Sequence, residues 1–252
     1  PARLASLLQL IPIEGSVADI GTDHGLLPAA LVLRGQVGRV IASDIRRGPL
    51  EAARRTLEEW ELEGKVELRL GSGLRVLTPG EVDYVVVAGI SGVQTAELLL
   101  DSRSQPAVRS LRAVICQPAQ KTALLRRNLR LAGWVPMQET LVAERGKFYV
   151  NLVYRPSASC SEERDGGESS FPSAALLDEI GPCLWRTRPP GYRQYVQEIA
   201  GRYERIAQQV RRGENRTASS EKRLAELQRL NRELKKCLRE LDRCGGADSC
   251  RN

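Results

Sequence analysis

The sequence predicts an α/β fold with a mostly parallel sheet, followed by a basic α-helical coiled-coil hairpin. Two patterns predict it: strand-like apolar runs alternate with helix-like stretches as far as Tyr154, and apolar residues recur every three or four positions from Tyr192 onwards. The first pattern is typical of a parallel sheet covered by helices and the second of a coiled coil. We expect an α/β domain over 1–156, a linker rich in Ser, Gly and charge over 157–183, and a hairpin over 184–252.

The α/β part is predicted from its apolar runs and turn residues. Strands are expected at 16–20, 39–43, 66–70, 83–88 and 111–116, and helices at 27–34, 49–61 and 121–132. Pro49 suits the first turn of its helix, and Gly133 suits the position just after the last helix. Segments 135–143 and 147–154 are predicted to form an antiparallel hairpin. Strand–helix units closed by such a hairpin are typical of a class I, Rossmann-like methyltransferase domain.

Two stripes predict the C-terminal hairpin. Spacings of three and four relate Tyr192, Val196, Ile199, Tyr203, Ile206 and Val210, and again Leu224, Leu227, Asn231, Leu234, Leu238 and Leu241. The break at 212–220 holds Gly, Asn and Ser, so two antiparallel helices are the simplest structure. Asn231 lies on the stripe, where a buried amide fixes the register of a coiled coil. Pairing with a second chain is the alternative, so we expect a monomer or a weak dimer.

Positive charge is concentrated in the C-terminal part. The chain has 38 Lys and Arg against 31 Asp and Glu; residues 1–183 hold 21 against 22, and residues 184–252 hold 17 against 9. A basic segment beside a nearly neutral domain indicates a polyanionic partner, because neutralising phosphates releases bound counterions. The alternative is that these charges only solvate exposed helices.

Composition argues against several other classes. Six cysteines without a CxxC pair and a single histidine argue against a metal site, and the α/β pattern argues against a disulfide-stapled secreted fold. No run approaches the roughly 18 apolar residues that span a bilayer, and the first residues lack a basic stretch followed by an apolar one. We therefore expect reduced thiols, no metal, no membrane and a cytoplasmic location.

The strongest local pattern is the loop at 19–25, Asp-Ile-Gly-Thr-Asp-His-Gly, between the first strand and the first helix. In folds that bind S-adenosylmethionine (SAM), an acidic residue ends this strand and glycines let the backbone approach the cofactor. Asp19 or Asp23 is placed to accept a hydrogen bond from the methionine ammonium. His24, the only imidazole of the chain, is either a catalytic or base-positioning residue or one that holds the loop through a backbone hydrogen bond.

Two further cofactor contacts are predicted at the next strand ends. Asp44 ends the second strand, roughly 20 residues past the glycine loop, where a carboxylate takes both ribose hydroxyls. The alternative is an aspartate that caps the following turn. After the third strand comes Gly-Ser-Gly-Leu at 71–74, where Ser72 offers a short neutral hydrogen-bonding group to the adenine.

The turn at 88–92, Ala-Gly-Ile-Ser-Gly, is predicted to receive the methyl acceptor, because α/β proteins place reacting groups at the carboxyl end of the sheet. Enzymes that methylate exocyclic amines of bases usually have an Asn/Asp-Pro-Pro-aromatic turn here. A small, glycine-flanked turn instead leaves room for a flat ring to approach the sulfonium. The pattern therefore favours a ring nitrogen as the acceptor.

Together these motifs resemble the TrmK family, bacterial tRNA methyltransferases that modify N1 of adenine 22. The resemblance rests on 18–28 (Ala-Asp-Ile-Gly-Thr-Asp-His-Gly-Leu-Leu-Pro), Gly48-Pro49-Leu50, 71–74, 88–92, Gln117-Pro118 and Gly146-Lys147-Phe148-Tyr149. It runs from about Arg3 to Tyr154 and continues in kind through the tail, since the family also carries a C-terminal coiled-coil hairpin. It implies a class I fold, SAM as cofactor and tRNA as partner.

The motifs and the resemblance give the candidate sites. Predicted cofactor-binding residues are Asp19, Gly21, Thr22, Asp23, His24, Asp44, Ile45, Gly71, Ser72, Gly73, Leu74, Ala88, Gly89 and Ile90. Predicted catalytic residues are Asp23, His24, Gly89 and Ser91, and residues expected to contact tRNA phosphates are Arg202, Arg205, Arg229 and Arg232. The chain departs from the family pattern at Ser72 (typically Asp), at Ile90-Ser91 (typically Met-Gly) and at Ala119 (often polar), which affects the adenine end of the cofactor site and the acceptor pocket.

The predicted mechanism is in-line transfer of the SAM methyl group to adenine N1, catalysed mostly by positioning because the lone pair of N1 needs no strong base. N1 lies on the pairing edge, so the base must be unpaired or extruded first. Two alternatives stay open: a catalytically weakened relative that binds SAM and tRNA, and a small-molecule methyltransferase that dimerises through its coiled coil. A NAD-dependent oxidoreductase ranks last, since the terminal hairpin and the loop sequence are both wrong for it.

Overall fold

The structure, a computed structural model, describes residues 2–36, 38–101, 106–156, 171–212 and 218–245. The chain divides into two compact units, an α/β unit (residues 1–162) and a helical unit (residues 163–252). The predicted linker from 157 to 170 and the break from 213 to 217 lie outside the described residues. None of the helices in the described part of the chain is long and apolar enough to cross a membrane.

The α/β unit is built on one seven-stranded sheet. Its strands are β1 (Val17–Ile20), β2 (Val40–Asp44), β3 (Glu67–Leu70), β4 (Tyr84–Ala88), β5 (Ala113–Gln117), β6 (Val135–Glu144) and β7 (Lys147–Arg155). Its helices are α1 (Ala2–Leu10), α2 (Leu26–Leu33), α3 (Arg47–Glu59), α4 (Gly92–Asp101), α5 (Pro106–Arg109) and α6 (Thr122–Leu131), and Gly73–Val76 forms the 3-10 helix η1. All the predicted strands and helices of this unit are confirmed within a few residues.

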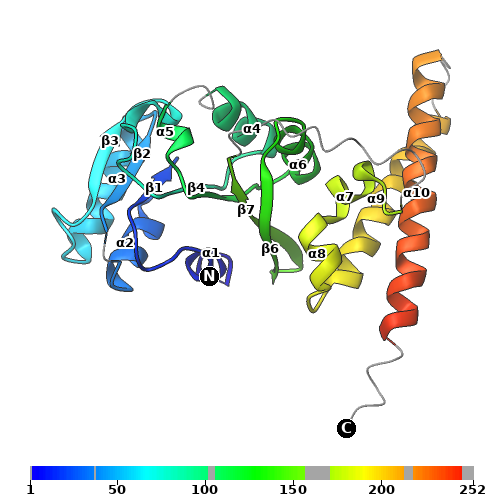
Figure 1. Ribbon diagram of the computed structural model, residues 1–252, viewed down its shortest axis with the longest axis horizontal. Coiled ribbons are helices and arrows are strands. Elements are labelled where there is room, and N and C mark those ends of the chain that lie inside the picture. Colours follow the sequence, from blue (N-terminus) through cyan, green and yellow to red (C-terminus); the bar gives the residue numbers. More distant parts are fainter. Residues whose placement is uncertain (1, 37, 102–105, 157–170, 213–217, 246–252) are drawn as a thin grey trace, which may run out of the picture. The chain divides into compact units, whose positions relative to one another are not determined.

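The strand order is β3-β2-β1-β4-β5-β7-β6 (Figure 1). β1 pairs in parallel with β2 on one side and with β4 on the other, and β7 runs antiparallel between β5 and β6. Arg145 and Gly146 join β6 to β7 with φ angles of 51° and 72°, the left-handed conformation that a tight two-residue hairpin requires. The predicted α/β class and its terminal antiparallel hairpin are therefore confirmed.

Apolar side chains from the central strands and the helices form the core of this unit. Val85, Val86 and Val87 of β4 are fully buried, as expected for a strand covered on both faces. Helix α1 packs against α2 and α2 against α3, whereas α4 packs against α6, and Figure 1 shows α1 and α2 on the opposite side of the sheet from α4 and α6. Helix α1, which the sequence analysis did not predict, buries Leu7 in this core, and Ile11, which directly follows the helix, is buried there too.

The helical unit contains α7 (Ala174–Ile180), α8 (Pro182–Thr187), α9 (Tyr192–Arg212) and α10 (Ala218–Gly245). Residues 174–183, which were expected in the linker, form α7 and the start of α8 instead. The reason is local: Leu176 and Ile180 lie at helical spacing and are fully buried, and the hydroxyl of Ser173 caps α7 by accepting from the Leu176 N–H at 3.2 Å.

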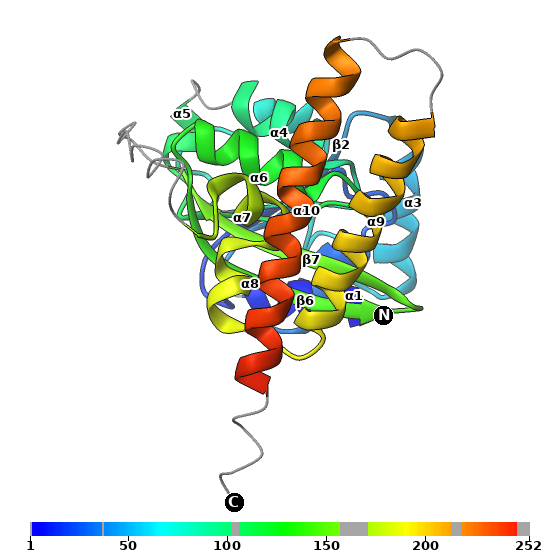
Figure 2. The same ribbon diagram turned by 90° about the vertical axis from the view of Figure 1, so that its right-hand side faces the viewer.

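Helices α9 and α10 form an antiparallel pair (Figure 2). Arg193, at the start of α9, lies 2.6 Å from the Asp242 carboxylate near the end of α10, which fixes the opposite directions of the two helices. The buried residues of α10 are Leu234, Cys237 and Leu241, so Cys237 takes the place expected for Leu238. Because α7 also packs on α10, the buried face is rotated from the predicted stripe. Regular coiled-coil packing remains a prediction.

Candidate active site

The glycine loop after β1 is fastened to the neighbouring strand. The N–H groups of Gly21 and Thr22 both donate to the Ser43 carbonyl, at 2.8 and 2.9 Å. Gly21 has a φ of +82° and open space where a Cβ would be, so the backbone is exposed to an approaching ligand. A Cβ on Gly25 would lie 2.9 Å from that of Ala53, so this glycine permits close packing against α3, and its predicted role in the approach of the cofactor stays a prediction.

Asp19 brings a buried carboxyl to this loop. Its residue is 5% exposed, and burial raises the pKa of the carboxyl to about 6, a rise that the charge of Asp44 increases and the nearby Thr22 hydroxyl opposes. Within the described residues Asp19 has no ion-pair partner, and the buried hydroxyls of Thr22 and Ser43 lack a partner at standard hydrogen-bond geometry. A buried carboxyl beside unpartnered hydroxyls fits a ligand that brings a positive ammonium group.

Asp44 ends β2 and is 7% exposed. Its Oδ1 accepts a hydrogen bond from the Arg46 N–H at 2.9 Å, so the turn-capping role considered from the sequence is present. Oδ2 forms no hydrogen bond or ion pair with any described residue and is left for a ligand. The next residue, Ile45, is 67% exposed. A carboxylate with one bound and one open oxygen fits a ribose hydroxyl, and the ribose role stays a prediction.

The loop after β3 is tied to the same edge, since the Gly71 N–H donates to the Asp44 carbonyl at 3.0 Å. Ser72 is exposed, whereas the side chain of Leu74 is buried in the core at 1% exposure. The side chain of Leu74 therefore cannot contact a ligand, and this residue can contribute only its backbone groups. Gly73 has a φ of +55° and begins η1.

Two loops are bonded together at the carboxyl ends of β4 and β5. Gly89 N–H donates to the Gln117 carbonyl at 3.0 Å, and the Gly92 N–H donates to the Gln120 carbonyl at 2.8 Å. A Cβ on Gly92 would lie 2.3 Å from the Lys121 carbonyl oxygen, so only glycine permits this approach. The backbone of the turn at 88–92 is thus held rigidly beside the glycine loop of β1, which pairs with β4.

Ser91 has a structural role in this turn. Its hydroxyl accepts from the Gln94 N–H at 3.2 Å, while its own N–H donates to Gln94 Oε1 at 3.2 Å. This reciprocal pair is a capping box that begins α4. The catalytic role of Ser91 stays a prediction, and the contacts of its side chain indicate helix capping instead.

Asp23 and His24 lie at the exposed tip of the glycine loop. The His24 Nε2 atom is 3.6 Å from the Asp23 carboxylate, and the two side chains are 65% and 68% exposed. Asp23 has a φ of +52°, a left-handed conformation that is uncommon outside glycine. Both side chains are thus open to a substrate that approaches the loop, and their predicted roles stay predictions.

A buried polar network behind the site was missed from the sequence. The Gln117 side chain donates to Asn151 Oδ1 at 2.5 Å, and the Asn151 amide donates to the Ser6 and Thr140 hydroxyls at 2.9 Å each. Asn151 is fully buried in β7, between the apolar neighbours Val150 and Leu152. A single amide in an apolar strand indicates such a network, because a buried amide must find partners. It fixes the strand end that carries the loop after Gln117.

The predicted RNA-contacting arginines differ in whether they form ion pairs with carboxylates of the same unit. Arg202 lies 3.0 Å from the Glu179 carboxylate, and Arg229 lies 3.8 Å from that of Glu233. Arg205 is exposed, and Arg232 lines a groove of the helical unit. In the part of the chain that the structure describes, no group of three or more His, Cys, Asp or Glu side chains could hold a metal ion.

The strand order and the polar groups at the carboxyl ends of β1 and β2 define the class of a methyltransferase domain. The profile of the methyltransferase domain family matches residues 1–152. The tRNA (adenine(22)-N(1))-methyltransferase of Bacillus subtilis is 29% identical over 219 residues, which are 85% of this chain and 88% of that protein.

Solved structures agree. The crystal structure of the B. subtilis M1A22 tRNA methyltransferase TrmK superposes with a TM-score of 0.78 at 26% identity, covering 94% of this chain and 97% of that one. A putative tRNA (m1A22) methyltransferase of Streptococcus pneumoniae, solved with S-adenosyl-L-methionine, gives a TM-score of 0.76 at 24% identity over 94% and 99% of the two chains. The present chain belongs to the methyltransferase domain family and, within it, to the TrmK family.

Proposed function

We propose that this protein transfers a methyl group from SAM to N1 of adenine 22 in tRNA. The observation that carries the proposal is the pair of buried carboxyls, Asp19 and Asp44, at the carboxyl ends of β1 and β2. They lie beside the point where the strand order reverses from β1 to β4, which is where open α/β sheets bind ligands. The B. subtilis relative, named for this reaction, supports the acceptor.

Each end of the cofactor has a matching group. Asp19 accepts from the methionine ammonium, the open Oδ2 of Asp44 accepts from the ribose, and the backbone at 71–74 meets the adenine. Bound SAM supplies an electrophilic methyl group on its sulfonium. Transfer of this group to the lone pair of adenine N1 would leave S-adenosylhomocysteine and a positively charged 1-methyladenine.

The chain itself positions the reactants. Because the turn at 88–92 is bonded to the loop after Gln117, its backbone stays fixed while the ring of the base enters. Small residues there leave room for a flat ring in line with the sulfonium, and such alignment is worth several orders of magnitude in rate. Asp23 and His24, exposed at the tip of the loop, contact the entering nucleotide.

The helical unit binds tRNA through its excess of Lys and Arg. Arg205 and Arg232 contact phosphates directly, whereas Arg202 and Arg229 must exchange a carboxylate partner for a phosphate. We further propose a cytoplasmic location, where tRNA is found, and a monomer or a weak dimer in solution.

The test is incubation with labelled SAM and unmodified tRNA, followed by nucleoside analysis. The expected product is 1-methyladenosine, lost when adenine 22 is replaced by guanine. Product that persists after that replacement would refute the position, and absence of product despite SAM binding would favour a catalytically weakened relative. An RNA affinity that does not depend on salt would favour a small-molecule methyltransferase.

A binding variant tests the cofactor assignment. Asp44→Asn removes a charged acceptor worth about 1.5–3 kcal/mol, so the Kd for SAM should rise by about 10- to 150-fold in calorimetric titration. Glu59→Gln, an exposed carboxyl on α3, is the matched control and should leave the Kd unchanged. Equal affinities for SAM in the Asp44→Asn variant and the parent protein would contradict the ribose contact.

A further inference from the structure

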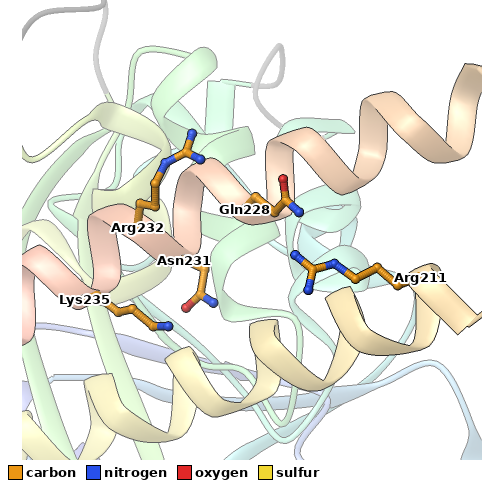
Figure 3. Close-up of a pocket in the computed structure, with 5 residues that line it drawn as sticks. All are labelled: Arg211, Gln228, Asn231, Arg232 and Lys235. Atoms are coloured by element: carbon orange, nitrogen blue, oxygen red, sulfur yellow. The ribbon is translucent and has the colours of Figure 1, made fainter.

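A groove between α9 and α10 collects positively charged side chains from both helices. It has a volume of about 350 Å³ and is lined by Arg211, Gln228, Asn231, Arg232 and Lys235. Figure 3 shows Arg211 extending from α9 towards α10, and Lys235 and Asn231 extending from α10 into the space between the helices. The side chain of Arg232 extends from α10 away from the space between the helices. The volume lies at the lower end of the range of small-ligand sites, about 300–1,000 Å³.

The cations of this groove lack the carboxylate partners that neutralise others on the same helices. Arg193 and Arg202 are held by Asp242 and Glu179 at 2.6 and 3.0 Å. By contrast, Arg211, Arg232 and Lys235 form no ion pair with any residue that the structure describes. Three uncompensated charges around one groove raise its positive potential, which attracts an anion.

Asn231 adds an unsatisfied acceptor to the same groove. Its Oδ1 atom is buried and, among the described residues, has no hydrogen-bond partner. A buried acceptor without a donor is unfavourable, so a ligand that brings a hydroxyl donor next to an anion would satisfy the whole lining. A ribonucleotide does so, because its 2′-hydroxyl lies close to the backbone phosphate and is absent from DNA.

We propose that this groove binds one ribose-phosphate unit of the tRNA backbone. Arg211 and Lys235 hold the phosphate from opposite helices, and the 2′-hydroxyl donates to Asn231 Oδ1. The groove is thus the point at which the helical unit distinguishes RNA from DNA. The proposal rests on the proposed function only in naming tRNA as the RNA that is bound.

The first test removes the two charges that reach into the groove. Arg211→Gln with Lys235→Gln should lower the affinity for tRNA about 5- to 10-fold near 0.1 M salt and reduce the slope of log K against log salt by about 1, the effect of one lost phosphate contact. Arg193→Gln with Lys236→Gln is the matched control: it removes the same two residue types, but Arg193 pairs with Asp242 and Lys236 lies 3.8 Å from the centre of the Phe171 ring.

The readout is fluorescence anisotropy with labelled tRNA between about 50 and 200 mM salt. Circular dichroism and thermal melting confirm that each variant folds; glutamine favours helix, and the groove cations have no ion pair to lose within the described chain. An equal loss of slope in the groove and control variants would overturn the proposal.

The second test addresses the 2′-hydroxyl. The preference for RNA over DNA oligonucleotides of the same sequence should fall about two- to tenfold in Asn231→Leu, the effect of one hydrogen bond, while the affinity for DNA stays the same. Leucine suits this stripe position, so the hairpin keeps its fold. An unchanged preference would overturn the assigned role of Asn231.

The outcomes separate this inference from the proposed function. If tRNA is methylated but the groove variant binds like its control, the groove assignment alone fails. If the parent protein yields no 1-methyladenosine but loses salt-dependent RNA binding in the groove variant, the methylation proposal fails and the groove assignment stands.

Discussion

The ionised carboxyl of Asp19 is buried, so it lowers the free energy of unfolding of the protein before the cofactor binds. Burial raises the pKa of this carboxyl from 3.8 to about 6. Between these values the folded state binds more protons than the unfolded state, so stability should fall as the pH rises from about 4 to about 6. Above pH 6 the accumulated cost is about 3 kcal/mol, at about 1.4 kcal/mol per pH unit.

Asp19→Asn removes this charge and keeps the shape. Since a buried amide carries its own smaller desolvation cost, we expect the variant without SAM to gain about 1–3 kcal/mol at pH 7. For a unit of 162 residues, about 2–4 °C per kcal/mol gives a melting temperature about 2–12 °C higher. The same change should abolish tight SAM binding, because the ammonium loses its carboxylate.

The assay is thermal melting without SAM at pH values from about 4 to 8, compared between Asp19→Asn and the parent protein, with the Kd for SAM measured at each pH. Asp23→Asn, on the same loop but 68% exposed in its side chain, is the matched control for melting without SAM and should follow the parent curve of melting temperature against pH. The parent protein should also bind SAM about tenfold more weakly for each pH unit below 6. A variant that is less stable than the parent at pH 7, or a parallel pH dependence of the two, would refute the reasoning.

Two further changes test the packing behind the site by urea unfolding. Gly92→Ala places a Cβ 2.3 Å from the Lys121 carbonyl oxygen and should lower the free energy of unfolding by about 1–3 kcal/mol. The control Gly48→Ala, in α3, meets open space and should raise it by up to about 1 kcal/mol. Equal effects of the two changes would contradict the close approach of the two loops. Arg126→Met removes the guanidinium that lies 2.7 Å from the fully buried Glu139 carboxylate and should cost about 3–5 kcal/mol. Most of this loss should be recovered when Glu139→Leu is added, and a double variant no more stable than the single one would count against this account.

The sequence predicted the sheet well because its patterns are local and strong. Apolar runs alternate with periodic stretches, and the short link between β6 and β7 permits only a hairpin. Helix α1 escaped prediction, although Leu4, Leu7 and Ile11 have helical spacing. A helix this short is stable only when its apolar face is covered, and that cover comes from strands far along the chain. The same holds for α7, which buries Leu176 and Ile180.

The sequence predicted the parts of the site that depend on backbone geometry. It was less informative about the parts that depend on contacts between side chains. Glycines after strands marked the three loops that meet at the sheet edge. The pattern Ser91-x-x-Gln94 was also visible, and it is the sequence form of a capping box, so the structural role of Ser91 could have been found. The capping bond of Asp44 was likewise among the readings of the local sequence, whereas the network of Asn151 depends on residues that the fold brings together from distant parts of the chain, which no local pattern contains.

The net charge of the C-terminal part predicts a partner of opposite charge, but it does not show which cations are available to bind RNA. The excess of Lys and Arg in residues 184–252 indicates a polyanion, but a count treats every cation alike. The fold divides them: Arg193 and Arg202 are neutralised by carboxylates, whereas Arg211 and Lys235, about 24 residues apart in the sequence, reach into one groove because α9 and α10 run antiparallel. A phosphate is bound more strongly where two cations converge on it. Cations that are not already paired with protein carboxylates keep their full attraction for the phosphate. The strongest contact of the helical unit should therefore be the groove, and the paired arginines should contribute less than their number implies.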